Sequence, residues 1–150
     1  DITTVLQGAI AFKETLDRMK EILTGIGDFD VIIGPEARGF IFAAPMAYAL
    51  GKSFVPIRKK GKLPYKTVSV EYELEYGTDI LEIHEDAIMP GQKVVIVDDL
   101  LATGGTALSN ISLIEKLGGQ VAGLVYFIEL DFLEGRKKLQ GYNVHSIVRF

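Results

Sequence analysis

The sequence contains no cysteine, which excludes disulfide bonds, thiolate metal sites and cysteine nucleophiles. It also lacks an apolar run long enough to span a bilayer. Positive charge is not in excess: the net charge is -4, so the totals do not indicate general attraction to nucleic acid or to an anionic membrane. The opening residues, Asp1-Ile2-Thr3-Thr4, have neither the basic start nor the apolar stretch of a signal peptide. We therefore expect a cytoplasmic protein.

The composition is that of a globular domain of ordinary size. The chain has 150 residues, of which 48% are hydrophobic and 24% charged, enough to bury a substantial core. Internal repeats, low-complexity stretches and linkers are all missing from the sequence. We predict a single domain over residues 1–150.

Short apolar runs alternate with helical patterns along the chain. Apolar spacing of three or four predicts helices over residues 4–24, 37–51, 105–117 and 131–139. Continuous apolar runs predict strands over residues 31–34, 54–60, 93–99, 120–130 and 142–150. Alternating polarity around Gly77-Thr78 predicts a β-hairpin over residues 67–84. Strands that alternate with helices predict an α/β fold, with a mostly parallel sheet covered on both faces.

The stretch "VVIVDDLLATGGTALSN" (94–110) carries the clearest chemical signal. A buried strand ends in two aspartates, where ligands bind in sheets of this kind. Gly104 and Gly105 let backbone N–H groups converge, Thr103 and Thr106 add hydroxyl donors, and the next helix aims its positive end at the same place. This combination predicts a site for a phosphate monoester.

Asp98 and Asp99 would repel that phosphate, so we expect them to face a hydroxyl-rich part of the ligand. A ribose whose diol donates to the two carboxylates, while the loop holds its 5′-phosphate, meets both demands. The sequence has no GxxxxGK[ST] and no GxGxxG motif, which excludes two common phosphate loops. The alternative is an ordinary polar turn at the end of a buried strand.

These residues resemble a known family. The stretch Val94–Thr106 is similar to the phosphoribosyl pyrophosphate (PRPP) loop of type I phosphoribosyltransferases. The order and spacing of further motifs resemble the adenine phosphoribosyltransferase family, and they cover nearly the whole chain. These motifs are "GPEARGF" (34–40), "IRKKGKLPY" (57–65), "LEYGTDILEIHEDAI" (74–88) and "DDLLATGGT" (98–106).

The resemblance implies a type I phosphoribosyltransferase fold, with a β-hairpin lid over about residues 60–88. It implies transfer of phosphoribose from PRPP to adenine, which gives AMP and pyrophosphate in purine salvage. It further implies Mg²⁺, held mainly by PRPP or pyrophosphate rather than by protein side chains, and a homodimer. The transfer passes through an oxocarbenium-like state, as in glycoside chemistry.

By the same resemblance, Arg38, Lys59 and Lys62 contact pyrophosphate, with Mg²⁺ as a Lewis acid. The family also has a cis peptide before the arginine, which here is the bond Glu36–Ala37. From the residues alone, the basic run 58–62 could equally be a solvated loop.

The resemblance makes Glu75 the catalytic residue that exchanges a proton with N7 of the base, with Tyr76 beside it near pyrophosphate. By pattern alone, Glu75 shares a strand face with Glu71 and Glu73, which favours three carboxylates in water. A glycine-flanked polar hairpin also suits a lid that excludes water.

The resemblance also assigns the remaining substrate contacts. Asp98 and Asp99 bind the ribose hydroxyls, and Leu100 offers an apolar surface to the purine. The backbone that receives the 5′-phosphate comprises Ala102, Thr103, Gly104, Gly105 and Thr106.

Three alternatives remain open. In the family a small hood precedes the residues that match Asp1-Ile2, so we expect the hood to be missing from the molecule or to precede the sequence given. Another purine transferase, acting on hypoxanthine, guanine or xanthine, is disfavoured because residues 121–130 contain no lysine to read a 6-oxo group and end instead near Glu129. A non-catalytic PRPP-binding module, as in regulators of this fold, would need a DNA-binding part, and we do not expect one within these 150 residues.

Overall fold

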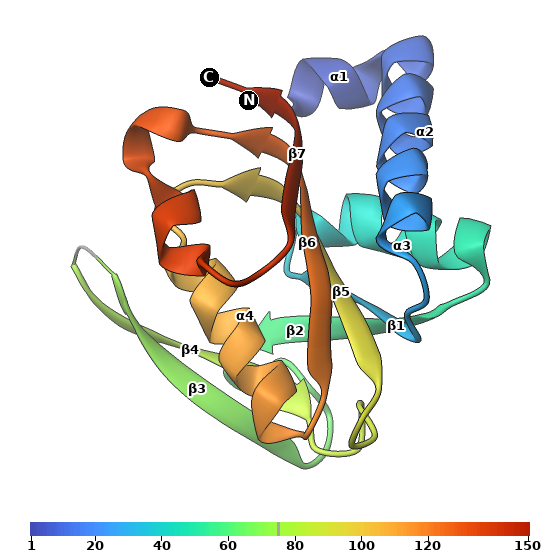
Figure 1. The fold of residues 1–150 in the computed structure, drawn as a ribbon. Coiled ribbons are helices and arrows are strands. Elements are labelled where there is room, and N and C mark those ends of the chain that lie inside the picture. Colours follow the sequence, from blue (N-terminus) through green and yellow to red (C-terminus); the bar gives the residue numbers. More distant parts are fainter. Residues whose placement is uncertain (75) are drawn as a thin grey trace.

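The computed structural model describes residues 1–74 and 76–150 and contains one seven-stranded sheet (Figure 1). The strand order is β3-β4-β2-β1-β5-β6-β7. Strands β2, β1, β5, β6 and β7 run parallel, and β4 pairs antiparallel with both β2 and β3. The strands are β1 (Val31–Pro35), β2 (Ser53–Lys59), β3 (Thr67–Leu74), β4 (Gly77–His84), β5 (Lys93–Leu101), β6 (Gln120–Glu129) and β7 (Val144–Arg149). This confirms the predicted α/β fold with a mostly parallel sheet.

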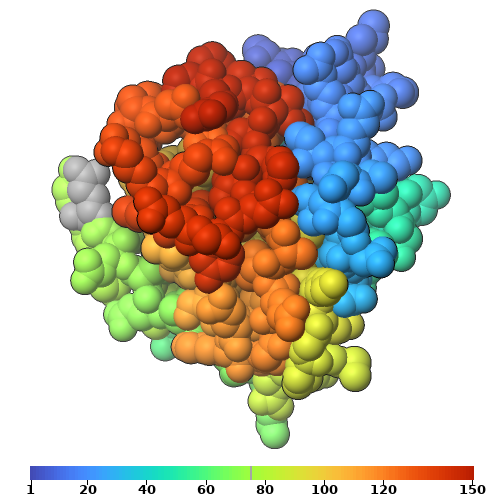
Figure 2. All heavy atoms as spheres, in the orientation of Figure 1, coloured from blue at the N-terminus to red at the C-terminus, as the bar shows by residue number. Residues whose placement is uncertain are grey.

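Helices cover both faces of the sheet (Figure 1). They are α1 (Thr3–Gln7), α2 (Ala9–Ile26), α3 (Gly39–Leu50) and α4 (Gly105–Lys116), with two short 3-10 helices, η1 (Asp131–Leu133) and η2 (Gly135–Leu139). Helices α2 and α3 pack on one face, and α4 packs on the other. In space-filling view, the C-terminal segment fills the region between the N-terminal helices and the hairpin (Figure 2).

Strand alternation divides the core into two clusters. On β5, Val94 and Ile96 pack toward α4, whereas Val95 and Val97 pack toward α2 and α3. Successive side chains of a strand point to opposite faces, so apolar runs without alternation are what a sheet covered on both faces requires.

The hairpin β3–β4 lies at the edge of the sheet beside α4 (Figure 1). Val68, Val70 and Tyr72 pack against the core cluster on the α4 side, while Leu74 near the tip is exposed. The Lys116 ammonium donates to the Ser69 carbonyl at 2.7 Å, which ties the end of α4 to β3. The predicted hairpin is confirmed; its function as a lid stays a prediction.

Three predicted elements differ from those in the structure. The predicted helix over 4–24 is two helices, because Gly8 adopts an extended conformation (φ -94°, ψ 107°) that breaks the helical path. The predicted helix over 131–139 is two 3-10 turns, separated by Glu134 in the left-handed region (φ 54°). The strand predicted to end at Asp99 continues to Leu101, because β5 stays paired with β6 through Leu101 and Glu129.

Within the described ranges, the structure contains no helix with the length and apolar character needed to cross a membrane.

Candidate functional site

A polar cavity of about 240 Å³ opens at the carboxyl ends of the neighbouring strands β1 and β5. It lies where ligands bind in open parallel sheets. Its lining consists of residues 35–38, 98–104, 106, 107 and 126. The structure therefore brings together two segments that the sequence analysis singled out separately, the arginine loop after β1 and the acidic loop after β5.

The loop between β5 and α4 presents free backbone donors. Gly104 adopts the left-handed conformation (φ 84°) and caps α4, which places the start of the helix beside the cavity. In the described part of the chain, the amides of Thr103, Gly104, Gly105 and Thr106 donate to no backbone carbonyl. Unpaired amides at the positive end of a helix are suited to bind phosphate oxygens.

Asp98 lies on the α4 side of β5, opposite Tyr126 of β6 in the strand register. One of its oxygens, Oδ1, accepts a 2.8 Å hydrogen bond from the Asp99 amide. Burial and the neighbouring Asp99 carboxylate raise the pKa of Asp98 well above its usual range. A partly buried carboxylate in this position favours a ligand that brings hydroxyl donors or a cation.

Asp99 points to the other side of the strand and is only 5% exposed. Its Oδ2 lies 2.8 Å from Nε of Arg38, whose side chain is 62% exposed. The structure thus joins a residue predicted to bind ribose with one predicted to bind pyrophosphate. Both still line the cavity, so the pair forms part of its wall.

Close packing of α3 against β5 sets the position of Arg38. A Cβ atom on Gly39 would lie 2.8 Å from Asp98 Oδ1 and 2.8 Å from Pro35 Cδ, so only glycine fits at the start of this helix. The peptide bond Glu36–Ala37 is cis, which confirms the expectation drawn from the family resemblance.

The basic loop 58–62 is held by acidic side chains rather than solvated throughout. Glu36 Oε1 accepts a 2.6 Å hydrogen bond from the Lys59 amide, and Glu82 Oε2 accepts one of 3.1 Å from the Gly61 amide. The Lys59 ammonium lies 3.2 Å from Asp79 Oδ2 on the hairpin, and this contact raises the pKa of Lys59. Lys59 is therefore charged and tied to β4.

A second cavity of about 300 Å³ adjoins the first and was missed by the sequence analysis. The two cavities share Arg38, Asp99 and Leu100. Its other lining residues are Asp1, Ile2, Ile128, Leu130 and Phe150. No local motif could have indicated it, because these residues come from both ends of the chain and meet only in the fold.

The predicted site residues divide into two groups. Arg38, Asp98, Asp99, Leu100, Ala102, Thr103, Gly104 and Thr106 line the polar cavity. Among the described candidates, Gly105, Lys59, Lys62 and Tyr76 do not line it, and Tyr76 is 94% exposed. The predicted catalytic residue Glu75 lies outside the described residues.

The described residues contain no group of three His, Cys, Asp or Glu side chains placed to hold a metal ion. The cavity does offer carboxylate oxygens from Asp98 and Asp99, the ligand type that Mg²⁺ prefers. One or two carboxylates together with substrate phosphates are a common Mg²⁺ environment, so these residues fit an ion that arrives with a diphosphate.

Residues 5–148 match the phosphoribosyl transferase domain family. An adenine phosphoribosyltransferase of Acetivibrio thermocellus is 71% identical over 150 residues, which cover all of this chain and 88% of that relative. The chain belongs to the adenine phosphoribosyltransferase family. The adenine phosphoribosyltransferase of Thermoanaerobacter pseudethanolicus superposes with a TM-score of 0.96 at 57% identity, covering 100% of this chain and 87% of that one.

A second solved family member connects the fold with ligands. The adenine phosphoribosyltransferase of Saccharomyces cerevisiae, in complex with an imino-altritol bisphosphate and adenine, has a TM-score of 0.91 at 40% identity. The match covers 96% of this chain and 83% of the yeast chain. The family and the type I phosphoribosyltransferase fold predicted from the sequence are therefore confirmed.

Proposed function

We propose that this chain transfers the 5-phosphoribosyl group of PRPP to adenine, giving AMP and pyrophosphate in purine salvage. The observation that carries the proposal is the pair of adjoining cavities, one polar with free loop amides and one mainly apolar, which meet at Arg38, Asp99 and Leu100. A sugar phosphate suits the first cavity and a flat purine suits the second. Family membership supports the same activity.

The 5′-phosphate is received by the backbone of Ala102–Thr106 and the hydroxyls of Thr103 and Thr106. The helix α4 contributes its positive end, which stabilises an anion without a lysine. This arrangement fixes one end of the substrate, so that C1 of the ribose lies at the junction of the two cavities.

Asp98 and Asp99 accept hydrogen bonds from the ribose hydroxyls. During transfer the bond from C1 to the diphosphate oxygen breaks, the bond from C1 to N9 of adenine forms, and adenine loses one proton. Positive charge develops on the ribose meanwhile, and nearby carboxylates stabilise it. Glu75, which lies outside the described residues, is the proposed acceptor of the N7 proton.

Arg38, Lys59 and Lys62 stabilise the departing pyrophosphate, next to Tyr76. Mg²⁺, bound mainly by the diphosphate, would act there as a Lewis acid. Lys59 is held by Asp79 in this structure, so it exchanges one anionic partner for another when it contacts pyrophosphate. The hairpin β3–β4 acts as a lid of the single domain and excludes water from the activated sugar.

Leu100 and the apolar residues of the second cavity provide the surface for the purine ring. Glu129, at the end of β6, is buried and bonded to Arg136, so it is not open to a base. The proposal also includes a homodimer in the cytoplasm, and light scattering of the purified protein tests the homodimer.

A base-selectivity assay tests the activity directly. The purified protein receives PRPP and Mg²⁺ with adenine, hypoxanthine or guanine, and the nucleotide products are separated by chromatography. The proposal predicts AMP from adenine far faster than IMP or GMP from the other bases. Equal use of hypoxanthine would reassign the base, and binding of PRPP without any turnover would favour a non-catalytic module.

A further inference from the structure

The segment between β6 and β7 packs directly on the phosphate loop. A Cβ atom on Gly135 would lie 2.2 Å from the Ala102 carbonyl oxygen and 3.0 Å from the Gly104 amide nitrogen. In return, a Cβ atom on Gly104 would lie 2.7 Å from the Gly135 carbonyl oxygen. The two backbones approach closely enough to exclude any side chain, so the position of Gly135 limits where the loop can lie.

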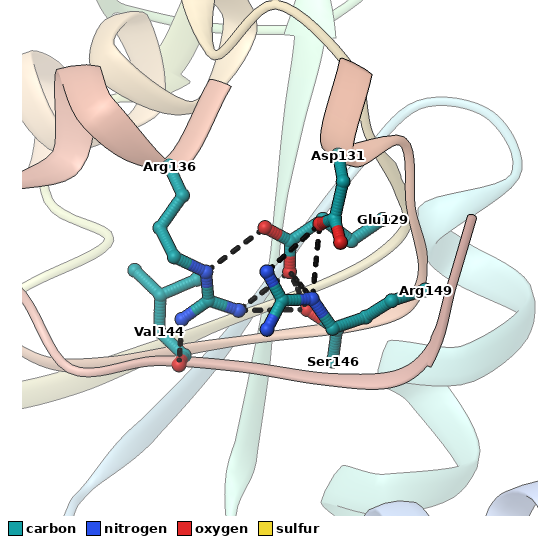
Figure 3. Close-up of polar contacts among 6 residues, drawn as sticks. All are labelled: Glu129, Asp131, Arg136, Val144, Ser146 and Arg149. Carbon is teal, nitrogen blue, oxygen red and sulfur yellow. Dashed lines mark hydrogen bonds and ion pairs between the residues drawn. The ribbon is translucent and has the colours of Figure 1, made fainter. Parts of the chain in front are cut away.

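Arg136, the next residue, fixes this segment to the end of the sheet (Figure 3). Its Nε and Nη2 donate to Oε1 and Oε2 of Glu129 on β6, the Nε bond measuring 2.9 Å. Its Nη1 donates to the Val144 carbonyl at 2.7 Å, and Nη2 also donates to Ser146 Oγ at 3.0 Å. The two-pronged geometry constrains the guanidinium in angle as well as distance.

Glu129 is the buried centre of this cluster, with 2% of its surface exposed. The Ser146 hydroxyl donates to it, and Arg149 lies nearby with Nε 3.8 Å from Oε2 (Figure 3). The hydrogen bond from Arg136 holds the pKa of Glu129 below its usual range, so the carboxylate is charged at neutral pH. Breaking a buried ion pair strongly destabilises the folded protein, because it leaves an uncompensated buried charge. The pair therefore constrains the positions of both side chains.

We propose that Glu129 and Arg136 are positioning residues for the sugar-phosphate site. The pair fixes Gly135, Gly135 supports the backbone of Ala102–Gly104, and that backbone receives the 5′-phosphate. Neither side chain contacts the substrate. The inference rests on the proposed function, because it assigns the loop to the 5′-phosphate.

Gly135→Ala tests the steric step. Because its Cβ would overlap the Ala102 carbonyl, the loop must move. Since a misplacement of about 1 Å can cost about a hundredfold in rate, we expect AMP binding to weaken by about tenfold to a hundredfold. The measurement is calorimetric titration with AMP, together with the KM for PRPP and for adenine. We expect weaker AMP binding and a raised KM for PRPP, with the KM for adenine nearly unchanged. Gly25→Ala is the control, since nothing lies within 4 Å of its added Cβ.

Arg136→Met and Arg136→Lys test the ion pair. The methionine variant should weaken AMP binding by about tenfold or more, and lysine, which keeps the charge but loses the fork, should restore part of it. Arg18→Met is the matched control, because Arg18 also pairs with a glutamate but on the exposed face of α2. Ser146→Ala, which removes the hydroxyl that donates to Glu129 and accepts from Arg136, serves if the arginine variants do not fold.

Folded Gly135→Ala and Arg136→Met variants with unchanged AMP binding would overturn the inference, as would equal rises in both KM values. Unchanged AMP binding by Ser146→Ala would overturn the inference in the same way, although the expected loss of affinity is smaller for this variant. A wild-type protein that does not bind AMP at all would instead overturn the proposed function, and with it the premise of this inference.

Discussion

Arg38 Nε lies 2.8 Å from Asp99 Oδ2, across the boundary between the polar and the apolar cavity. The pair joins the loop after β1 to the end of β5, two segments 61 positions apart in the sequence (99 minus 38). Under the proposed function, the pair places the cation assigned to pyrophosphate beside the carboxylate assigned to the ribose hydroxyls.

Arg38→Met should lower kcat/KM for PRPP by about tenfold to a hundredfold, because charged hydrogen bonds contribute roughly 1.5–3 kcal/mol each. It also leaves the buried Asp99 carboxylate without its partner, so thermal stability should fall as well. Steady-state kinetics and thermal unfolding measure the two effects. Arg18→Met is the control, since Arg18 is 61% exposed and Arg38 is 62% exposed. Equal kinetics for the two variants would remove Arg38 from the site.

Asp98→Asn should make the protein more stable at neutral pH and less active. Burial raises the folded-state pKa of Asp98, so the stabilising contribution of its proton is complete below the unfolded value of about 3.9 and is lost as pH rises through the raised folded-state pKa. The asparagine variant should therefore exceed the wild type in free energy of unfolding at about pH 8, and the excess should shrink as pH falls toward 4. Denaturant unfolding at several pH values measures this. An excess that does not vary with pH would contradict the assignment.

Gly104→Ala should impair PRPP binding beyond the cost of backbone strain. Gly104 has φ 84° and its added Cβ would meet the Gly135 carbonyl at 2.7 Å. Gly91→Ala is the matched control, because Gly91 has φ 85° and open space around the added atom. Both variants should lose about 1–2 kcal/mol of stability from the left-handed conformation. Only Gly104→Ala should raise the KM for PRPP. If Gly91→Ala raises this KM equally, the rise comes from backbone strain and not from the loop at Gly104.

Glu75→Gln should lower kcat by about a hundredfold to ten-thousandfold while the KM for PRPP changes little, as expected for a residue that transfers a proton. The pH profile of kcat should also lose the limb that reports this carboxylate. Glu73→Gln, an exposed neighbour on β3, is the control. If both glutamine variants keep wild-type kcat, the proton acceptor is another group.

Local sequence signals were sufficient to predict the sheet and the glycine turn between β5 and α4. The apolar runs of β1, β5 and β6 and the Thr-Gly-Gly-Thr turn each depend on neighbouring residues, and both aspartates line the predicted cavity. The break at Gly8 was missed because the apolar spacing continues across it, and spacing alone does not register one extended residue.

Contacts between distant segments could not be predicted in the same way. The Arg38–Asp99 pair, the Lys59–Asp79 pair and the apolar cavity formed by both ends of the chain depend on how strands are ordered in the sheet. The bonds of Arg136 likewise require β6 and β7 to be adjacent. These contacts determine how the side chains around the cavity are held in place. The sequence therefore indicated a class of ligand more clearly than it indicated the contacts that support the site.

A crystal structure of the protein with AMP tests the central claim most directly. The account predicts the phosphate among the amides of Thr103–Thr106, the ribose hydroxyls facing Asp98 and Asp99, and the adenine ring against Leu100 in the apolar cavity. AMP bound elsewhere, with those amides facing solvent, would contradict it.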